Sequence, residues 1–120
     1  MVHCYPIGLV DGRVHVVLVE FERRGTNALA SLVLVDGRRA IFADYEAEYR
    51  GPGSDLWRVD DEGRLSPEGF QLVTALRRGT EWMLAVSWAG TEGVSLSLLV
   101  ANRADRFTTV LREYWYQVPL

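Results

Sequence analysis

The four residues Val-Asp-Gly-Arg occur twice in the chain, at 10–13 and at 35–38. Each copy lies between runs rich in Val, Leu and Ile. Asp-Gly supplies the two positive-φ residues that a type I′ turn requires, so each copy predicts a two-residue turn of a β-hairpin. Two copies are too few to imply a solenoid, and we expect two hairpins of one antiparallel meander.

The first of these turns predicts the pairing of its hairpin. The expected partners, from the open end to the turn, are Tyr5 with Leu18, Pro6 with Val17, Gly8 with His15, and Leu9 with Val14. Both faces of this hairpin are largely apolar, so we expect it to be covered on both sides or partly by an oligomeric neighbour. Pro6 has no amide hydrogen to donate, which predicts that the first strand lies at a sheet edge.

Two further hairpins are expected. The turn at 36–37 places Leu32 opposite Ile41 and Ala30 opposite Ala43. Residues 81–89 and 93–100 form the next hairpin, around Gly90-Thr91-Glu92. Two alternating sets of side chains make up its second strand, Leu96, Leu98 and Val100 on one side and Ser95, Ser97 and Leu99 on the other. One face of this strand is therefore expected in the core.

Residues 66–79 carry the signals of a helix. Ser66 is a good N-cap, Pro67 suits the first turn, and Glu68 favours the positive end of the helix dipole. Phe70, Val73 and Leu76 follow at helical spacing, and Arg77-Arg78-Gly79 resembles a helix C-terminus. We therefore predict a central helix here.

The last segment, residues 105–118, is ambiguous between helix and strand. Its apolar residues follow the helical spacing i, i+3, i+4, i+7, i+8, i+11 and are Phe107, Val110, Leu111, Tyr114, Trp115 and Val118. Many of the residues in this segment are β-branched or aromatic, which favours a strand. Periodicity is the stronger signal, so we predict a C-terminal helix and keep the strand as the alternative.

Length and composition are those of one globular domain. The chain has 120 residues, of which 48% are hydrophobic and 24% charged, proportions typical of a soluble, ordered protein. Together with the elements above, this predicts a single α+β domain over 1–120. We expect an antiparallel β-meander of about six strands, with one central helix and a C-terminal helix packed against it.

The charged residues exclude several function classes. Thirteen basic residues against sixteen acidic ones give a net charge of -3. We therefore expect no nucleic-acid partner, because proteins that bind nucleic acid neutralise phosphates with clustered cations. All the basic residues are Arg. Without Lys the chain can form neither a Schiff base nor a P-loop.

No metal site or catalytic centre is expected. The soft ligands are His3, Cys4 and His15. In the predicted register the two histidines lie about 16 Å apart, at ~3.3 Å per residue, which is too far for one coordination sphere. The acidic run Asp60-Asp61-Glu62 adjoins Gly63 in a predicted turn, where solvated acids are usual. We therefore assign no catalytic residue, metal or cofactor.

The aromatic residues carry the functional hypothesis. Four Trp and five Tyr exceed what a core of this size uses easily, so some rings should be exposed. Exposed Trp, Tyr and Arg are typical of protein-contact hot spots. We expect a non-enzymatic interaction module, in the manner of an adaptor, chaperone-like protein or assembly component, that self-associates or docks a protein partner. The candidate contact residues are Arg112, Tyr114, Trp115 and Tyr116, with the edge strand at 2–9.

The alternative belongs to another class. Three tryptophans could line a pocket between sheet and helices that binds a small molecule or performs catalysis, namely Trp57, Trp82 and Trp88. The first ten residues lack a secretory signal and the chain lacks an apolar run long enough to cross a bilayer. We therefore expect a cytoplasmic protein with no membrane partner, and a homo-oligomer as the simplest form of self-association.

Overall fold

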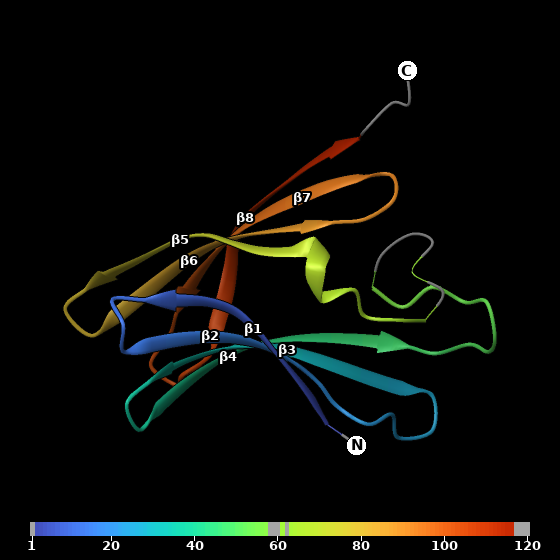
Figure 1. The fold of residues 1–120 in the computed structure, drawn as a ribbon, viewed down its shortest axis with the longest axis horizontal. Coiled ribbons are helices and arrows are strands. Elements are labelled where there is room, and N and C mark those ends of the chain that lie inside the picture. Colours follow the sequence, from blue (N-terminus) through green and yellow to red (C-terminus); the bar gives the residue numbers. More distant parts are fainter. Residues whose placement is uncertain (1, 58–60, 62, 117–120) are drawn as a thin grey trace.

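The protein consists almost entirely of β-strands (Figure 1). A computed structural model describes residues 2–57, 61 and 63–116. In it the strands are β1 (His3–Val10), β2 (Val14–Glu20), β3 (Asn27–Asp36), β4 (Arg39–Glu48), β5 (Phe70–Arg78), β6 (Glu81–Ala89), β7 (Gly93–Ala101) and β8 (Phe107–Tyr116). They form two four-stranded antiparallel sheets, ordered β1-β2-β3-β4 and β5-β6-β7-β8.

The two sheets lie face to face and enclose the hydrophobic core (Figure 1). The β1–β4 sheet supplies aliphatic side chains from alternate positions of its strands, such as Val14, Val16 and Leu18 of β2. The β5–β8 sheet adds Trp82, Leu84 and Leu99, all at most 2% exposed. Alternation of inward apolar residues is the pattern expected of packed antiparallel sheets, and burial of these side chains is the main stabilising contribution.

The predicted α+β class, with about six strands, is therefore wrong. Within the described residues, the single helical element is the three-residue 3-10 turn Pro67–Gly69. The expectation that β1 lies at a sheet edge is confirmed. Its Gly8 approaches Leu72 of β5 so closely that a Cβ atom at Gly8 would lie 2.8 Å from a methyl group of Leu72. The first strand is thus an edge of its own sheet and a neighbour of the other.

The first hairpin has the predicted pairing only away from its turn, where Tyr5 pairs with Leu18 and Pro6 with Val17. A β-bulge at Ile7 then shifts the register by one residue, so that Val10 pairs with Val14. The turn consequently has three residues rather than two. Asp11 and Gly12 do adopt positive φ, 51° and 72°, as the Asp-Gly signal predicted.

The second hairpin is displaced from its predicted register by two residues. Asp36 pairs with Arg39, and the turn is formed by Gly37 and Arg38, not by Asp36 and Gly37. Leu32 therefore pairs with Ala43 and not with Ile41. Because the displacement is even, the same side chains still face inward.

The third hairpin, β6–β7, lies where it was predicted. The buried face of β7 is the one with the serines: Ser95 and Ser97 are each 8% exposed and Leu99 is 1% exposed. The opposite face, with Leu96 and Leu98, is only half-buried. In this strand the more hydrophobic face is the outer one.

The predicted central helix is replaced by strand β5. Ser66 precedes only the short 3-10 turn and makes no side-chain capping hydrogen bond. Along β5, Phe70, Leu72 and Ala75 pack against the core. A bulge at Val73 inserts one residue between Leu72 and the next paired position, which lengthens the spacing of the inner residues from two to three. The predicted helical stripe of Phe70, Val73 and Leu76 thus combines an inner residue, the bulge residue and an outer residue, and the last two are each 57% exposed.

The predicted C-terminal helix is strand β8 as far as Tyr116, while Val118 lies outside the described residues. Another bulge causes the error: Leu98 pairs with Leu111 and Leu99 with Thr109, so Val110 has no partner in the ladder. Apolar residues on both faces of a bulged strand reproduce the i, i+3, i+4 spacing of a helix. The strand preference of the β-branched and aromatic residues was the better guide.

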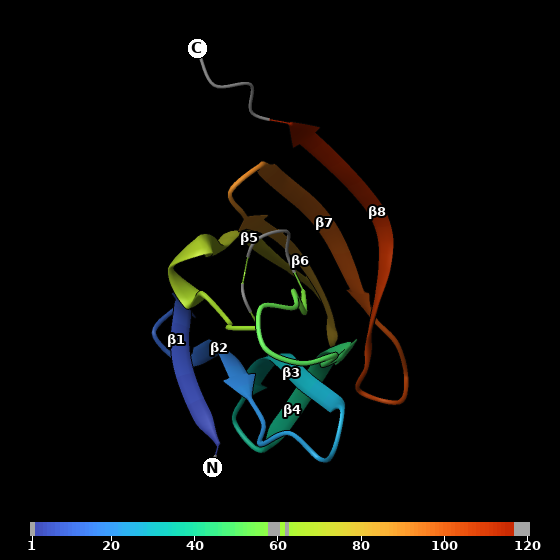
Figure 2. The same cartoon turned by 90° about the vertical axis from the view of Figure 1, so that its right-hand side faces the viewer.

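The two ends of the molecule differ. At one end, which holds the β3–β4 and β5–β6 turns, contacts join the sheets: Phe42 N donates to Asp105 O at 3.1 Å and Arg39 Nε donates to Asp105 Oδ1 at 2.8 Å. At the other end β7 and β8 diverge from β4 (Figures 1 and 2). The described parts of the connection between β4 and β5, residues 49–57 and 63–69, lie across this diverging end (Figure 2).

Candidate functional site

A cavity of about 340 Å³ lies between the sheets at the diverging end. Its lining comes from β4, the β4–β5 connection and the inner face of the second sheet: Asp44, Tyr45, Glu46, Leu56, Trp57, Phe70, Val86, Trp88, Ser95, Ser97 and Arg112. This volume falls within the usual range of small-molecule sites, about 300–1,000 Å³. A wider hollow of about 540 Å³ near the β2–β3 turn has Phe21 as its sole aromatic lining residue among the described residues.

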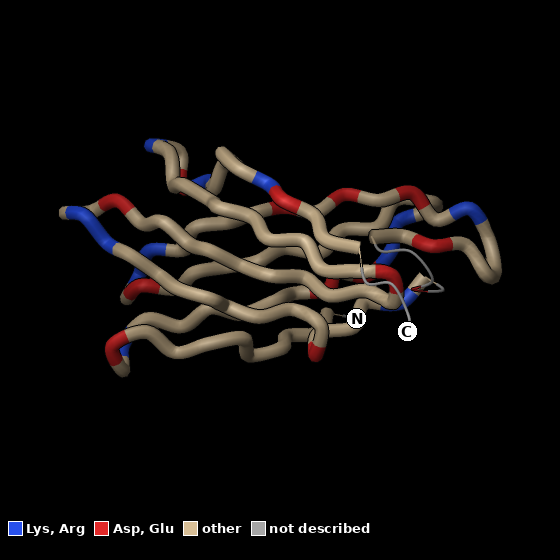
Figure 3. The backbone as a smooth tube through the Cα atoms, turned by 90° about the horizontal axis from the view of Figure 1, so that it is seen from above, with Lys and Arg blue, Asp and Glu red and all other residues tan. Residues whose placement is uncertain are grey.

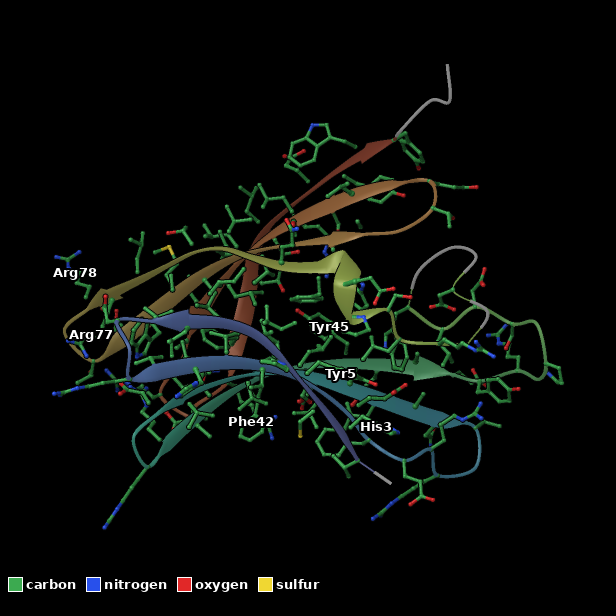
Figure 4. All side chains as sticks on the ribbon, viewed as in Figure 1. His3, Tyr5, Phe42, Tyr45, Arg77 and Arg78 are labelled. Carbon is green, nitrogen blue, oxygen red and sulfur yellow. The ribbon has the colours of Figure 1, made fainter. Side chains whose placement is uncertain are left out.

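Aromatic rings form one wall of this cavity. The centroids of Tyr45 and Trp88 are 5.2 Å apart, those of Phe70 and Trp88 5.2 Å, and those of Tyr45 and Phe70 6.0 Å. The rings meet edge-on or tilted, the arrangements that aromatic quadrupoles favour. Figure 4 shows Tyr45 between the two sheets. The three rings therefore support one another from both sheets.

Trp57 completes the aromatic lining from the β4–β5 connection. The carboxylate of Asp61 accepts backbone N–H groups from Leu56 at 2.8 Å, Trp57 at 2.7 Å and Gly63 at 2.9 Å. The indole Nε1 of Trp57 donates to the carbonyl of Tyr45 at 3.0 Å. A hydrogen-bonded carboxylate thus holds the loop and its tryptophan against β4. The sequence analysis treated Asp61 as a solvated turn acid; the other members of that run, Asp60 and Glu62, lie outside the described residues.

Of the charged residues that line the cavity, Asp44 has an ion-pair partner and, among the described residues, Arg112 has none. The Asp44 carboxylate accepts a hydrogen bond from Ser31 Oγ at 2.6 Å and forms an ion pair with Arg106 at 2.6 Å. Arg112 projects from β8 beside the buried Ser97 of β7. Within residues 2–57, 61 and 63–116, the side chains of Arg112 and Ser97 have no hydrogen bond and no ion pair.

Tyr45 is the one lining residue whose titration is strongly perturbed. Burial raises the pKa of its hydroxyl to about 12, and the nearby Arg112 guanidinium opposes part of this rise. The phenol is therefore neutral over the whole physiological range and can donate a hydrogen bond into the cavity. In the described chain no protein group accepts that hydrogen bond.

The structure separates the three tryptophans of the predicted pocket. Trp57 and Trp88 line the same cavity. Trp82 lies at the opposite end of β6, is 2% exposed, and donates its Nε1 hydrogen to Asp36 Oδ2 at 3.3 Å. Trp82 is thus part of the core and not of a pocket.

The four predicted contact residues do not share one face either. Trp115 pairs with Val94 on the outer face of the second sheet and is 54% exposed. Arg112, Tyr114 and Tyr116 alternate with it on the other side, and the rings of Tyr114 and Tyr116 pack edge-to-face at 4.7 Å. Arg112 belongs to the cavity instead.

The side chains that do accompany Trp115 form a broad surface, which we call the outer apolar face. Most of the outward residues of β5–β8 belong to it: Thr74, Leu76, Met83, Ala85, Val94, Leu96, Leu98, Val100, Leu111 and Trp115. The polar side chains Gln71, Ser87, Thr108 and Glu113 lie on the same side of the sheet. Leu76 is 57% exposed and Leu111 53%. Alternation in residues 94–100 was the signal for this face, but β5 and β8, the two edge strands of the sheet, were predicted as helices, so the face was not predicted.

Two further classes of site have no counterpart in the described part of the chain. It contains no cluster of three or more His, Cys, Asp or Glu side chains suited to a metal ion. It also contains no helix with the length and hydrophobicity needed to span a bilayer. Compared with known proteins, the chain matches no family model, no curated protein and no solved structure.

Proposed function

We propose that this protein is a non-enzymatic interaction module that self-associates through the outer apolar face of β5–β8. One observation carries the proposal: large apolar side chains, including Leu76, Leu111 and Trp115, are each more than half exposed on one continuous sheet face. A contiguous apolar surface of this kind marks an interaction site or an aggregation hazard in a monomer.

The distribution of charge supports a face-to-face contact. In the second sheet, charged residues lie mainly toward the strand ends (Figure 3). The outward charged residues are Arg78 and Glu81 beside the β5–β6 turn and Glu113 on β8. The outward positions of β6 and β7 from Met83 to Ala89 and from Val94 to Val100 carry no charged side chain, so this part of the face can be buried without desolvating a charge. Glu113 lies between Leu111 and Trp115 on the edge strand β8, where it can remain at the solvated rim of the contact.

The size of the face favours a second copy as the occupant. Strands of nine or ten residues, at about 3.3 Å per residue and about 4.8 Å between strands, give a face of roughly 600 Å². Two copies would then bury roughly 1,200 Å² in total, the lower limit for a stable specific interface. Stacked sheets with strands near-aligned, related by a two-fold axis, are a common way to pair such faces.

Sedimentation velocity over a range of protein concentrations tests the proposal. We expect a concentration-dependent dimer that Leu111→Glu converts to monomer, because the substitution would bury an unpaired charge within the contact. Leu9→Glu is the matched control, since Leu9 is 60% exposed but lies on β1 in the other sheet. A wild-type protein that stays monomeric at millimolar concentration, or a dimer broken by Leu9→Glu and not by Leu111→Glu, would contradict it.

A further inference from the structure

The geometry points to a second site: we propose that the cavity at the diverging end binds a small aromatic carboxylate, a single ring bearing a short acidic side chain. The ring would lie against Tyr45, Trp57 and Trp88, and the carboxylate would be bound by Arg112 and Ser97. This site lies between the sheets and is separate from the outer apolar face.

Size limits the ligand. A volume of about 340 Å³ corresponds to on the order of ten water-sized groups at about 30 Å³ each. A single six-membered ring with a two-carbon acid side chain has that size, whereas a nucleotide or a long fatty acid does not. The cavity is therefore suited to a compact molecule.

The residues that line the cavity favour a ligand with an aromatic ring. Four lining residues are aromatic, Tyr45, Trp57, Phe70 and Trp88, and Leu56 and Val86 add aliphatic surface. A planar ring can bury most of its area against such walls and continue their edge-to-face packing. Trp57 is already held by the Asp61 and Tyr45 contacts, so little ordering is needed when a ligand binds.

The hydrogen-bond donors of the cavity favour a ligand with a carboxylate. Arg112, Ser97 and the Tyr45 hydroxyl can all donate, and none has a hydrogen-bond partner within the described residues. Two carboxylates are among the lining residues, Asp44 and Glu46. The charge of Asp44 is balanced by Arg106, and Glu46 is exposed, so solvent screens its charge. An excess of free donors that includes one guanidinium favours an anionic acceptor, and a carboxylate matches the guanidinium in two parallel hydrogen bonds.

Titration with phenylacetate, followed by two-dimensional NMR of the labelled protein, tests the proposal. We expect saturable shifts at the backbone amides of Tyr45, Trp57 and Trp88. Phenylacetamide, which keeps the ring but lacks the charge, should bind at least tenfold more weakly, and so should acetate, which lacks the ring. Shifts that are equal for phenylacetate and phenylacetamide, or no saturation by phenylacetate at 10 mM, would overturn the proposal.

Matched arginine variants separate the site from general charge effects. Arg112→Gln should weaken phenylacetate binding at least tenfold, whereas Arg103→Gln, an exposed arginine in the β7–β8 loop, should leave it unchanged. Arg112 is exposed and without partners in the described chain, so its variant should fold normally, as thermal melting can verify. Equal affinity in wild type and Arg112→Gln, or tighter binding of a neutral sugar such as N-acetylglucosamine than of phenylacetate, would contradict the assignment.

Discussion

Strand β6 carries a tryptophan near each end, and the two have opposite surroundings. Trp82 is 2% exposed and hydrogen-bonded to Asp36, at the end where Asp105 joins the sheets. Trp88 is half-buried and lines a cavity at the end where the sheets diverge. The same residue type on the same face of one strand is thus a core element at one end and a site wall at the other. Contacts that hold the sheets together, rather than residue type, determine which role each has.

Truncating the two tryptophans should give the largest contrast. Trp82→Ala removes a fully buried ring and is expected to lower the free energy of unfolding by about 3–5 kcal/mol. Trp88→Ala should cost at least about 1 kcal/mol less, because part of its ring already contacts solvent. Chemical denaturation of both variants measures the difference. Equal losses would show that the diverging end is as tightly packed as the joined end.

Alkaline pH should weaken the diverging end specifically. The pKa of Tyr45 is raised from 10.0 to about 12 in the folded protein, so folding favours the neutral phenol. The contribution of the neutral phenol to the free energy of unfolding is complete below pH 10 and is lost as the pH rises from 10 to 12. The loss is about 3 kcal/mol, at ~1.4 kcal/mol per pKa unit. Chemical denaturation at pH 8, 10 and 11.5 measures the loss.

Tyr45→Phe provides the control for this pH dependence. The variant lacks the Tyr45 hydroxyl and retains every other ionisable group of the chain, which has no lysine. We expect its unfolding free energy to change less between pH 10 and 11.5 than that of the wild type. Identical slopes for the two proteins would mean that Tyr45 ionises as freely as it does in water.

Removing the acceptor at the joined end should have a moderate effect. Asp36→Ala leaves the indole N–H of the buried Trp82 without its acceptor at 3.3 Å, and we expect a loss of about 1–2 kcal/mol in unfolding free energy. Glu92→Ala also removes one negative charge, from an exposed turn at the diverging end. This substitution should change the unfolding free energy by less than about 0.5 kcal/mol. A comparable loss in both variants would indicate a general charge effect.

The smallest effect is expected from the ion pair of Arg106 with Asp44. The side chains are 54% and 35% exposed at a distance of 2.6 Å, and exposed pairs of this kind contribute about 0.2–1 kcal/mol. Arg106→Gln should therefore lower the melting temperature by only a few degrees at low salt, and by less at 1 M NaCl. A loss that persists at high salt would show that the contact of Arg106 with the Phe42 ring matters more than its charge.

The sequence predicted hairpins well and the class of the remaining segments poorly. Asp-Gly signals and alternating apolar residues correctly indicated three hairpins, although the bulge at Ile7 and the turn at Gly37-Arg38 changed their registers. Both false helices contain a bulge, at Val73 and at Val110. A single inserted residue has no signature of its own in the sequence, yet it changes a period of two into an apparent period of three to four.

The sequence predicted only part of the cavity, because the positions of its residues on β8 depend on a bulge. Aromatic content pointed to Trp57 and Trp88, but their association with Arg112 depends on which face of β8 the arginine occupies. That face is set by the bulge at Val110, because the bulge reverses the alternation for every residue after it. Arg112 was placed in the predicted contact surface together with Trp115 because the segment was predicted as a helix, whereas in a strand residues three apart lie on opposite faces.

Each sheet is built from one uninterrupted half of the chain, residues 3–48 and 70–116. All strand pairing is consequently between neighbours in sequence, which favours rapid local folding of each half before the halves associate. Because the core is shared between the two sheets, we expect the docking of the two halves to be a late step of folding. A break in the segment between them should leave two fragments that recombine into the native structure.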